Sequence, residues 1–146
     1  MSLRSSGFEI LEHTADVLVR AWGDSLEEAL ASAILGMYEV MTDLSRVEAR
    51  EERVVEAEGI DLENLLYNLL EQLIVLFDEE AFLVSKVDRV ELSQRPEGWR
   101  VRVRVLGERY DPERHESRVL VKAATYHMMR IWSEGEKWYL QYVVDI

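Results

Sequence analysis

The stretch from Asp61 to Asp78, DLENLLYNLLEQLIVLFD, is the strongest indication of how this chain folds. Its apolar residues recur three and four positions apart, the spacing of one helix face: Leu62, Leu65, Leu66, Leu69, Leu70, Leu73, Ile74 and Phe77. Asp61 is a suitable N-cap, because its carboxylate can accept a hydrogen bond from a free backbone N–H of the first turn. A broad leucine face opposite polar residues is typical of buried core. We therefore expect a core helix over residues 61–78.

A second helix is predicted from Ser25 to Met41, where apolar residues again follow a spacing of three and four. Ser25 and Glu28 fit a capping box, in which each side chain can bond a free backbone N–H near the start of the helix. Gly36 lies inside this helix and weakens it by about 1 kcal/mol relative to alanine. We expect a close neighbour that needs the space at Gly36.

The rest of the chain is predicted to form strands, since short apolar runs alternate with polar residues and end at turn residues. The runs cover residues 8–11, 17–22, 47–57, 84–93, 99–106, 119–132 and 138–144. Turns containing Gly98 and Gly135 predict hairpins between the last four. The fold class expected is α+β: a single two-layer domain with two main helices packed on one largely antiparallel sheet.

Composition limits the classes of function. The chain has 146 residues, the size of one domain, and we expect a flexible leader over residues 1–6 and one domain over 7–146. Its 17 basic and 29 acidic residues give a net charge of −12, which opposes nonspecific nucleic-acid binding and favours cations or a basic protein partner. It has no cysteine, which excludes thiolate metal sites and disulfides. With no signal peptide or membrane span in the sequence, we expect a cytoplasmic protein.

Three arginines share one face of the strand over residues 99–106, namely Arg100, Arg102 and Arg104. They could contact RNA phosphates. Acidic residues such as Asp88 and Glu91 on the partner strand could instead pair with them across the sheet. We favour the cross-strand pairs, because opposite charges across strands are ordinary sheet chemistry.

Residues able to do chemistry gather at three places. His13-Thr14-Ala15-Asp16 lies at the break between the first two runs, where Asp16 could also be only a turn cap, and His13 only a hydrogen-bonded histidine that orients the turn. Lys122, Tyr126 and His127 lie on a late strand, with Lys122 and Tyr126 on one face and His127 on the other unless a bulge intervenes.

The third place is the end of the sequence, Asp145-Ile146, and His115 in a charged loop is expected to be solvated. Asp145 beside a terminal carboxylate at Ile146 would offer several oxygens, and Asp16 could complete a carboxylate cluster. Oxygen ligands suit Ca²⁺, Mg²⁺ or Mn²⁺. The alternative is an exposed acidic tail, because distance along the sequence does not show proximity.

The sequence resembles the archease family along nearly its whole length. The matching blocks are FEILEHTAD at 8–16, SLEEA at 25–29, GMYEVMTD at 36–43, EQL and LFD within 71–78, GERYDPERHE at 107–116, VKAATYH at 121–127, and the final Asp145-Ile146. This resemblance implies a fold related to the strand-helix-strand-strand (SHS2) module. It also implies an accessory factor of tRNA splicing and RNA repair, not an independent enzyme, that activates an RtcB-type RNA ligase by promoting its guanylylation and turnover.

The resemblance also implies roles for individual residues. Asp16, Asp145 and the Ile146 carboxylate correspond to a divalent-cation site, usually associated with calcium, and Lys122 to a position implicated in ligase activation. Two other functions stay open: a free-standing metal-dependent phosphoesterase with His127 as general base, and a chaperone or interaction module for an RNA-modifying methyltransferase.

Overall fold

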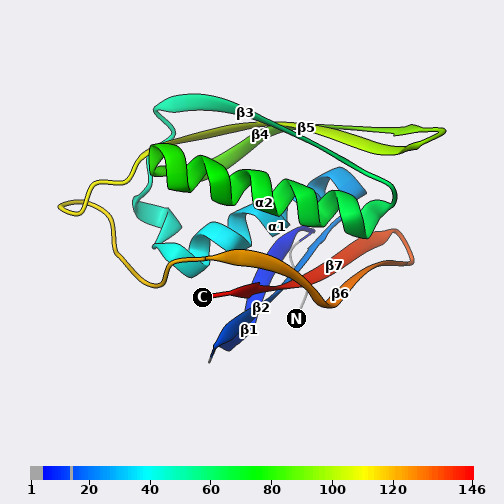
Figure 1. The fold of residues 1–146 in the computed structure, drawn as a ribbon, viewed down its shortest axis with the longest axis horizontal. Helices are drawn as coiled ribbons and strands as arrows, with labels where there is room; N and C mark the ends of the chain where they lie inside the picture. The colour runs from blue at the N-terminus through cyan, green and yellow to red at the C-terminus, as the bar shows by residue number, and fades with distance from the viewer. Residues whose placement is uncertain (1–4, 14) are drawn as a thin grey trace.

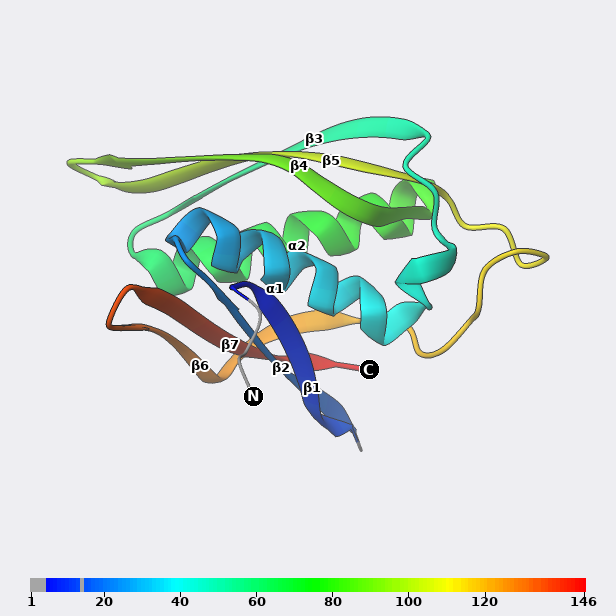
Figure 2. The same ribbon diagram turned by 180° about the vertical axis from the view of Figure 1, so that it is seen from behind.

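The computed structural model describes residues 5–13 and 15–146 of the chain, so Thr14 and most of the leader expected over residues 1–6 lie outside the described residues. A layer of two helices lies between two antiparallel sheets (Figures 1 and 2). The elements in chain order are β1 (Gly7–His13), β2 (Asp16–Gly23), α1 (Leu26–Met41), the 3₁₀ helix η1 (Leu44–Arg46), β3 (Glu51–Gly59), α2 (Leu62–Glu80), β4 (Phe82–Arg95), β5 (Gly98–Arg109), β6 (Ala123–Glu134) and β7 (Lys137–Asp145).

Both predicted helices begin at the caps that the sequence indicates. The Asp61 carboxylate accepts a hydrogen bond from the Asn64 N–H at 2.8 Å. The Ser25 hydroxyl accepts from the Glu28 N–H at 3.1 Å, and the Glu28 carboxylate accepts from the Asp24 N–H at 2.7 Å. The bonds from the Asn64 and Glu28 N–H groups satisfy backbone donors that the first helical turn leaves free, whereas the bond to the Glu28 carboxylate comes from Asp24, one residue before the N-cap Ser25. The leucine face of α2 is buried, so its prediction as core is confirmed.

The α+β class is confirmed, but the strands form two sheets where one was expected. One sheet has the order β1-β2-β7-β6 and the other β3-β5-β4. The physical reason is that α1 buries most of its circumference and packs against strands of both sheets. One sheet can shield only one side of such a helix, so a second sheet covers the other side. Alternation shows that a strand is half-buried but not which strand it pairs with.

The core joins the helix layer to the four-stranded sheet. Tyr142 of β7 donates a hydrogen bond from its buried hydroxyl to the Ala33 carbonyl of α1 at 2.7 Å. A Cβ on Gly36 would lie 2.7 Å from Cγ1 of the buried Val19, which confirms that a close neighbour occupies this space. Among the described residues, no helix is long and apolar enough to span a membrane.

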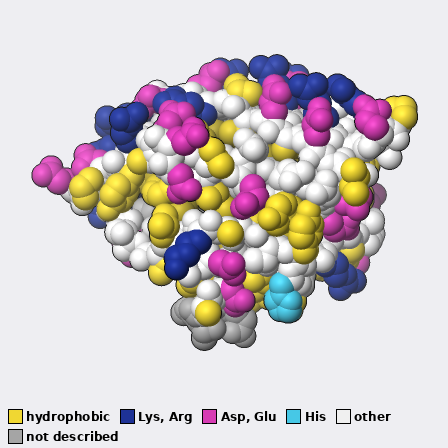
Figure 3. Space-filling view, in the orientation of Figure 1, with side chains coloured by type: hydrophobic (Ala, Val, Ile, Leu, Met, Phe, Trp, Pro, Cys, Tyr) yellow, Lys and Arg dark blue, Asp and Glu magenta, His cyan; other side chains and the backbone are white. Residues whose placement is uncertain are grey.

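The three arginines that share one face of β5, Arg100, Arg102 and Arg104, are paired with acidic residues of neighbouring strands, and Arg102 lies 3.7 Å from Glu56 of β3. Arg100 contacts Glu56 at 3.0 Å, Arg104 contacts Glu52 of β3, and Arg104 also lies 3.6 Å from Asp88 of β4. Figure 3 shows basic and acidic side chains intermingled along this edge of the molecule. The prediction of cross-strand pairs is confirmed, with Asp88 as one partner, but the partners come mainly from β3. The expectation for Glu91 is wrong, because Glu91 contacts Arg89 of its own strand at 3.1 Å.

Candidate functional site

Asp16 and Asp145 lie directly opposite each other on neighbouring strands. Asp16 begins β2, Asp145 ends β7, and the two are paired in the antiparallel register of these strands. The next pair, Val17 and Val144, is buried against the helices, so the two aspartates belong to the opposite, outward face. The backbone N–H of Ile146 continues the ladder by donating to the Ala15 carbonyl at 3.4 Å. We call Asp16, Asp145 and Ile146 the acidic edge.

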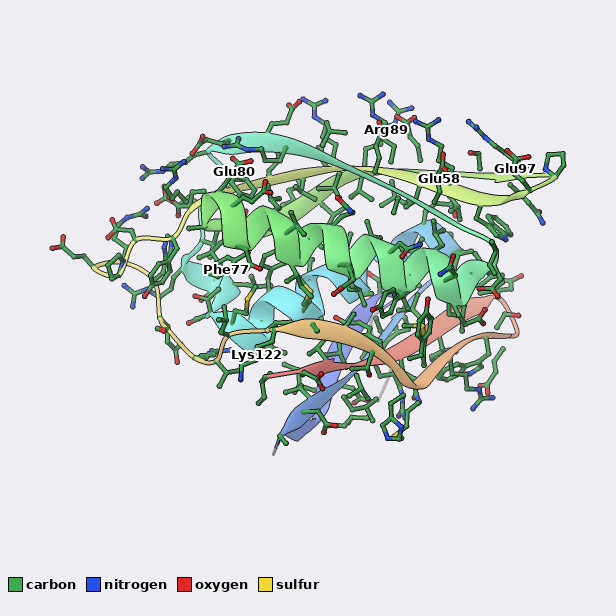
Figure 4. The ribbon with its side chains drawn as sticks, in the orientation of Figure 1. Glu58, Phe77, Glu80, Arg89, Glu97 and Lys122 are labelled. Carbon is green, nitrogen blue, oxygen red and sulfur yellow. The ribbon has the colours of Figure 1, made fainter. Side chains whose placement is uncertain are left out.

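Lys122 lies beside the acidic edge. Its backbone N–H donates to the Asp145 carbonyl at 2.8 Å, and the following residue, Ala123, pairs with Asp145 as β6 begins. Its side chain is exposed. Figure 4 shows Lys122 at the start of β6, at the end of the molecule where β7 finishes. The fold thus gathers all four residues that the sequence singled out for ligase activation or cation binding.

The donor chemistry of the acidic edge suits a hard cation. Like charges directly opposite on neighbouring strands repel each other, and their Cβ atoms are about 5 Å apart in such pairs. A cation held by both carboxylates would relieve this repulsion. Among the side chains that the structure describes, which do not include those of residues 12–14, no three His, Cys, Asp or Glu gather in a way that could hold a metal ion. Backbone carbonyls, and the carboxylate that the family resemblance assigns to Ile146, are candidates for further oxygen ligands.

Tyr126 and His127 do not join the acidic edge. Thr125 pairs with Val143 and Arg130 with Gln141, so residues 126–129 lie opposite Tyr142 alone and form a bulge. This bulge breaks the alternation along β6 on which their predicted faces depended. The ring of Tyr126 stacks on Tyr67 of α2 with centroids 4.3 Å apart, and its hydroxyl accepts a hydrogen bond from the Asn64 amide.

His13 ends β1, where it pairs with Val17, and its side chain lies outside the described residues. Its backbone position is next to the acidic edge, because Val17 directly follows Asp16.

A buried ionic cluster around Glu108, which strand alternation does not predict, holds the loop between β5 and β6. Glu108 and His115 are only 3% and 4% exposed, so the expectation that His115 is solvated is wrong. The Glu108 carboxylate accepts hydrogen bonds from Arg114 at 2.5 Å and from the Glu48 N–H at 2.8 Å, and it lies 2.9 Å from Nε2 of His115. The loop folds over Glu108, and burial of His115 follows from that closure.

The tautomer of His115 follows from its two partners. Its Nδ1 accepts a hydrogen bond from the Asp111 N–H at 2.8 Å, so the ring proton is on Nε2 and is donated to Glu108. Strand alternation places Glu108 on the polar face of β5, which is why sequence patterns missed it. The available signal was Arg114 and His115, six and seven residues further on in one charged segment.

The second half of the same loop is held by Arg118. Its backbone N–H donates to the Met41 carbonyl at 3.0 Å, and its guanidinium contacts the Glu39 carboxylate and carbonyl, each at 2.8 Å. The loop that leads to Lys122 is therefore fixed at Glu108, at the end of α1 and at Asp145. These contacts position Lys122 although the loop has no regular secondary structure.

Burial of Glu108 raises its pKa, but hydrogen bonds from Arg114, the Glu48 N–H and His115 outweigh this and lower the pKa to about 2, from an ordinary value of 4.5. Between these values the unfolded chain binds a proton that the folded chain does not. Acidification from about pH 4.5 to about pH 2 is therefore expected to remove about 3 kcal/mol of stability through this one group.

Urea unfolding of the wild type and Glu108→Gln at several pH values between about 6 and 2 tests this expectation. The stability difference between the two should shrink as the pH falls, because the variant has no carboxyl group to protonate at this position. A difference that is constant over this range would show that Glu108 has an ordinary pKa.

Sequence comparison identifies the relatives of this chain. The model of the archease protein family matches residues 8–146. The chain belongs to the archease family. The archease of Sulfurisphaera tokodaii is 46% identical over 143 residues, covering 95% of this chain and 98% of the relative. The archease of Aeropyrum pernix is 45% identical over 144 residues, covering 99% of this chain and 100% of the relative. The family resemblance inferred from the sequence blocks is confirmed.

Solved structures share the archease fold. A solution structure of a protein from Methanobacterium thermoautotrophicum aligns with a TM-score of 0.81 and 38% identity, over 96% of this chain and 99% of the other. A crystal structure of an archease from Thermotoga maritima, named a possible chaperone, aligns with a TM-score of 0.64 and 20% identity, over 100% of this chain and 99% of the other. At 20% identity, the second comparison bears on the fold alone.

Proposed function

We propose that this archease is an accessory protein of tRNA splicing and RNA repair that activates an RtcB-type RNA ligase. It promotes guanylylation of the ligase and repeated turnover. Asp16, Asp145 and Ile146 hold a divalent cation, most naturally calcium, and Lys122 acts beside them. The observation that carries this proposal is the cross-strand pairing of Asp16 with Asp145, with Lys122 bonded through its backbone to Asp145.

The chemistry of the acidic edge fits a role next to a phosphate-transfer site. A cation bound there would supply positive charge that neutralises and orients phosphate oxygens. Lys122 presents an ammonium group that can contact a nucleotide phosphate as a point charge. The net charge of −12 favours docking on a basic protein surface and disfavours binding RNA directly. The proposed contribution of the archease is thus to arrange charges around a reaction that the ligase performs.

The direct test mixes the purified protein with its cognate ligase, GTP, manganese and RNA ends. We expect faster transfer of guanylate to the ligase and more ligated RNA per ligase molecule than with ligase alone. Phosphoester hydrolysis by the archease without ligase would instead support the free-standing phosphoesterase. No change in guanylate transfer, combined with stable binding to an RNA methyltransferase, would support the interaction-module alternative.

Adding residues after Ile146 is expected to weaken calcium binding, because a peptide bond would replace the carboxylate that the proposal assigns as a ligand. Removing one charged ligand lowers the affinity of oxygen-ligand sites for calcium. Calorimetric calcium titration of the chain ending at Ile146 and of a version extended by two glycines gives the comparison. Equal calcium affinities would remove Ile146 from the ligand set and leave the two aspartates.

A further inference from the structure

An apolar hollow of about 450 Å³ lies next to the acidic edge. Elements distant in the sequence form it: β1, the start of β2, the end of α1, the loop before β6, and the end of the chain, which meet at one end of the molecule (Figure 2). Its apolar lining consists of Ile10, Val17, Val40, Val119 and Ile146. Val17 and Val40 are only 1% and 6% exposed, so they form its floor.

The polar residues of the hollow already have partners. Glu39 and Arg118 complete its lining and form an ion pair with each other at 2.8 Å. The Arg118 backbone is also bonded to Met41, so the wall is anchored to α1. With the charged pair satisfied and the floor apolar, the hollow suits an apolar side chain more than a charged ligand. Val119 and the adjacent Leu120 are 42% and 52% exposed, so the rim presents further apolar surface.

The hollow adjoins the acidic edge at the ends of β2 and β7. Val17 lines the hollow on the helix-facing side of the sheet, whereas Asp16 and Asp145 lie on the outward face of the same strand ends. Ile146 belongs to both the hollow and the acidic edge. A macromolecule that covers this end of the molecule can therefore contact the hollow and both carboxylates. An apolar centre beside the acidic edge, whose three proposed carboxylates carry more negative charge than one divalent cation neutralises, is complementary to an apolar side chain flanked by basic residues.

We infer, on the basis of the proposed function, that this hollow is the anchor site for the RNA ligase and receives an apolar side chain that basic residues of the ligase flank. The apolar contact holds the complex together, and the basic residues face Asp16 and Asp145. Docking at this point brings Lys122 and the acidic edge to the ligase surface.

Val119→Asn tests the anchor, with Val54→Asn as a matched control. Val119 and Val54 are 42% and 44% exposed, and Val54 lies on β3 in the other sheet. We expect Val119→Asn to weaken binding to the ligase by about tenfold or more, because it places an amide in an apolar contact. Val54→Asn should bind like the wild type. The dissociation constants are measured at one salt concentration, since the charged contacts depend on salt.

A thiol probe locates the contact independently of the affinity. The chain has no cysteine, so Val119→Cys and Val54→Cys each introduce a single thiol. Saturating ligase should slow alkylation of the thiol at position 119 by about tenfold or more and leave the thiol at position 54 unaffected. Alkylation protection is measured on the cysteine variants and does not depend on a loss of affinity. It therefore tests the anchor site even if Val119→Asn folds poorly.

Three results would overturn the anchor site. Wild-type binding to the ligase with no alkylation protection at position 119 would place the interface elsewhere while leaving the proposed function standing. Dissociation of a dimer of this chain by Val119→Asn, with ligase affinity unchanged, would make a second copy the occupant. No binding of the wild type to the ligase would overturn the proposed function and this site together.

Discussion

Asp145→Asn is expected to abolish stimulation of the ligase and to leave the folded protein as stable as the wild type or more stable. The two aspartates are paired directly across β2 and β7, where like charges repel. Replacing one carboxylate with an amide removes this repulsion, for a gain of up to about 1 kcal/mol in the absence of cation. The same change removes a charged oxygen ligand, so calcium affinity should fall by about tenfold or more.

Three measurements on one preparation test this prediction: guanylate transfer to the ligase, calcium titration, and unfolding in urea without metal. Asp78→Asn is the matched control, since Asp78 is an exposed aspartate on α2 that belongs to no part of the acidic edge. Full stimulation by Asp145→Asn would contradict the proposed role of the acidic edge. Loss of stimulation together with a large loss of stability would show instead that Asp145 supports the fold.

Glu108→Ala is expected to cost about 3–5 kcal/mol of unfolding free energy, the largest loss from any single charged residue discussed above. The change leaves Arg114, His115 and the Glu48 N–H without the acceptor that they share. Unpaired groups in a buried position are costly, and domains of this size are stable by only about 5–15 kcal/mol. Because the loop over Glu108 leads to Lys122, ligase stimulation should fall as well.

Urea unfolding near neutral pH measures this loss, with Glu56→Ala as the control. Glu56 also pairs with arginines, but its side chain is 45% exposed, so its removal should cost no more than about 1 kcal/mol. Similar losses for the two variants would mean that the contacts of Glu108 contribute no more than a surface ion pair. Hydrogen exchange of loop amides gives a second readout, since protection around residues 111–118 should decrease in Glu108→Ala.

The two helices and their caps could be read from the sequence because helix signals are local. The spacing of the leucines in α2 and the hydrogen bonds of Asp61 and Ser25 involve residues within a few positions of one another. Strand alternation is also a local signal, and it places the arginines of β5 on one face. The sequence could therefore predict that these arginines pair with acidic residues of neighbouring strands. Their main partners, Glu52 and Glu56, follow from the order of the strands, which is not a local property.

At the candidate site, too, the sequence identified individual residues, whereas the tertiary structure decided how they are placed. The blocks around Asp16, Lys122 and Asp145 established the family, and with it the residues to examine. Alternation failed at Tyr126 and His127 because a bulge in β6 changes which face each residue takes. Alternation also predicts an exposed side chain for Glu108, which is instead buried because a loop covers the polar face of β5 there.

By itself, the sequence determined the α+β class, the core faces of the helices, the archease family and the identity of the candidate residues. The division into two sheets, the burial of Glu108 and His115, and the apolar hollow were decided only by the tertiary structure. So was the place of Asp16 opposite Asp145, which the register of β2 against β7 fixes. The physical reason is that periodicity and capping act between near neighbours, whereas strand pairing and loop closure depend on which surfaces meet once the helices are buried.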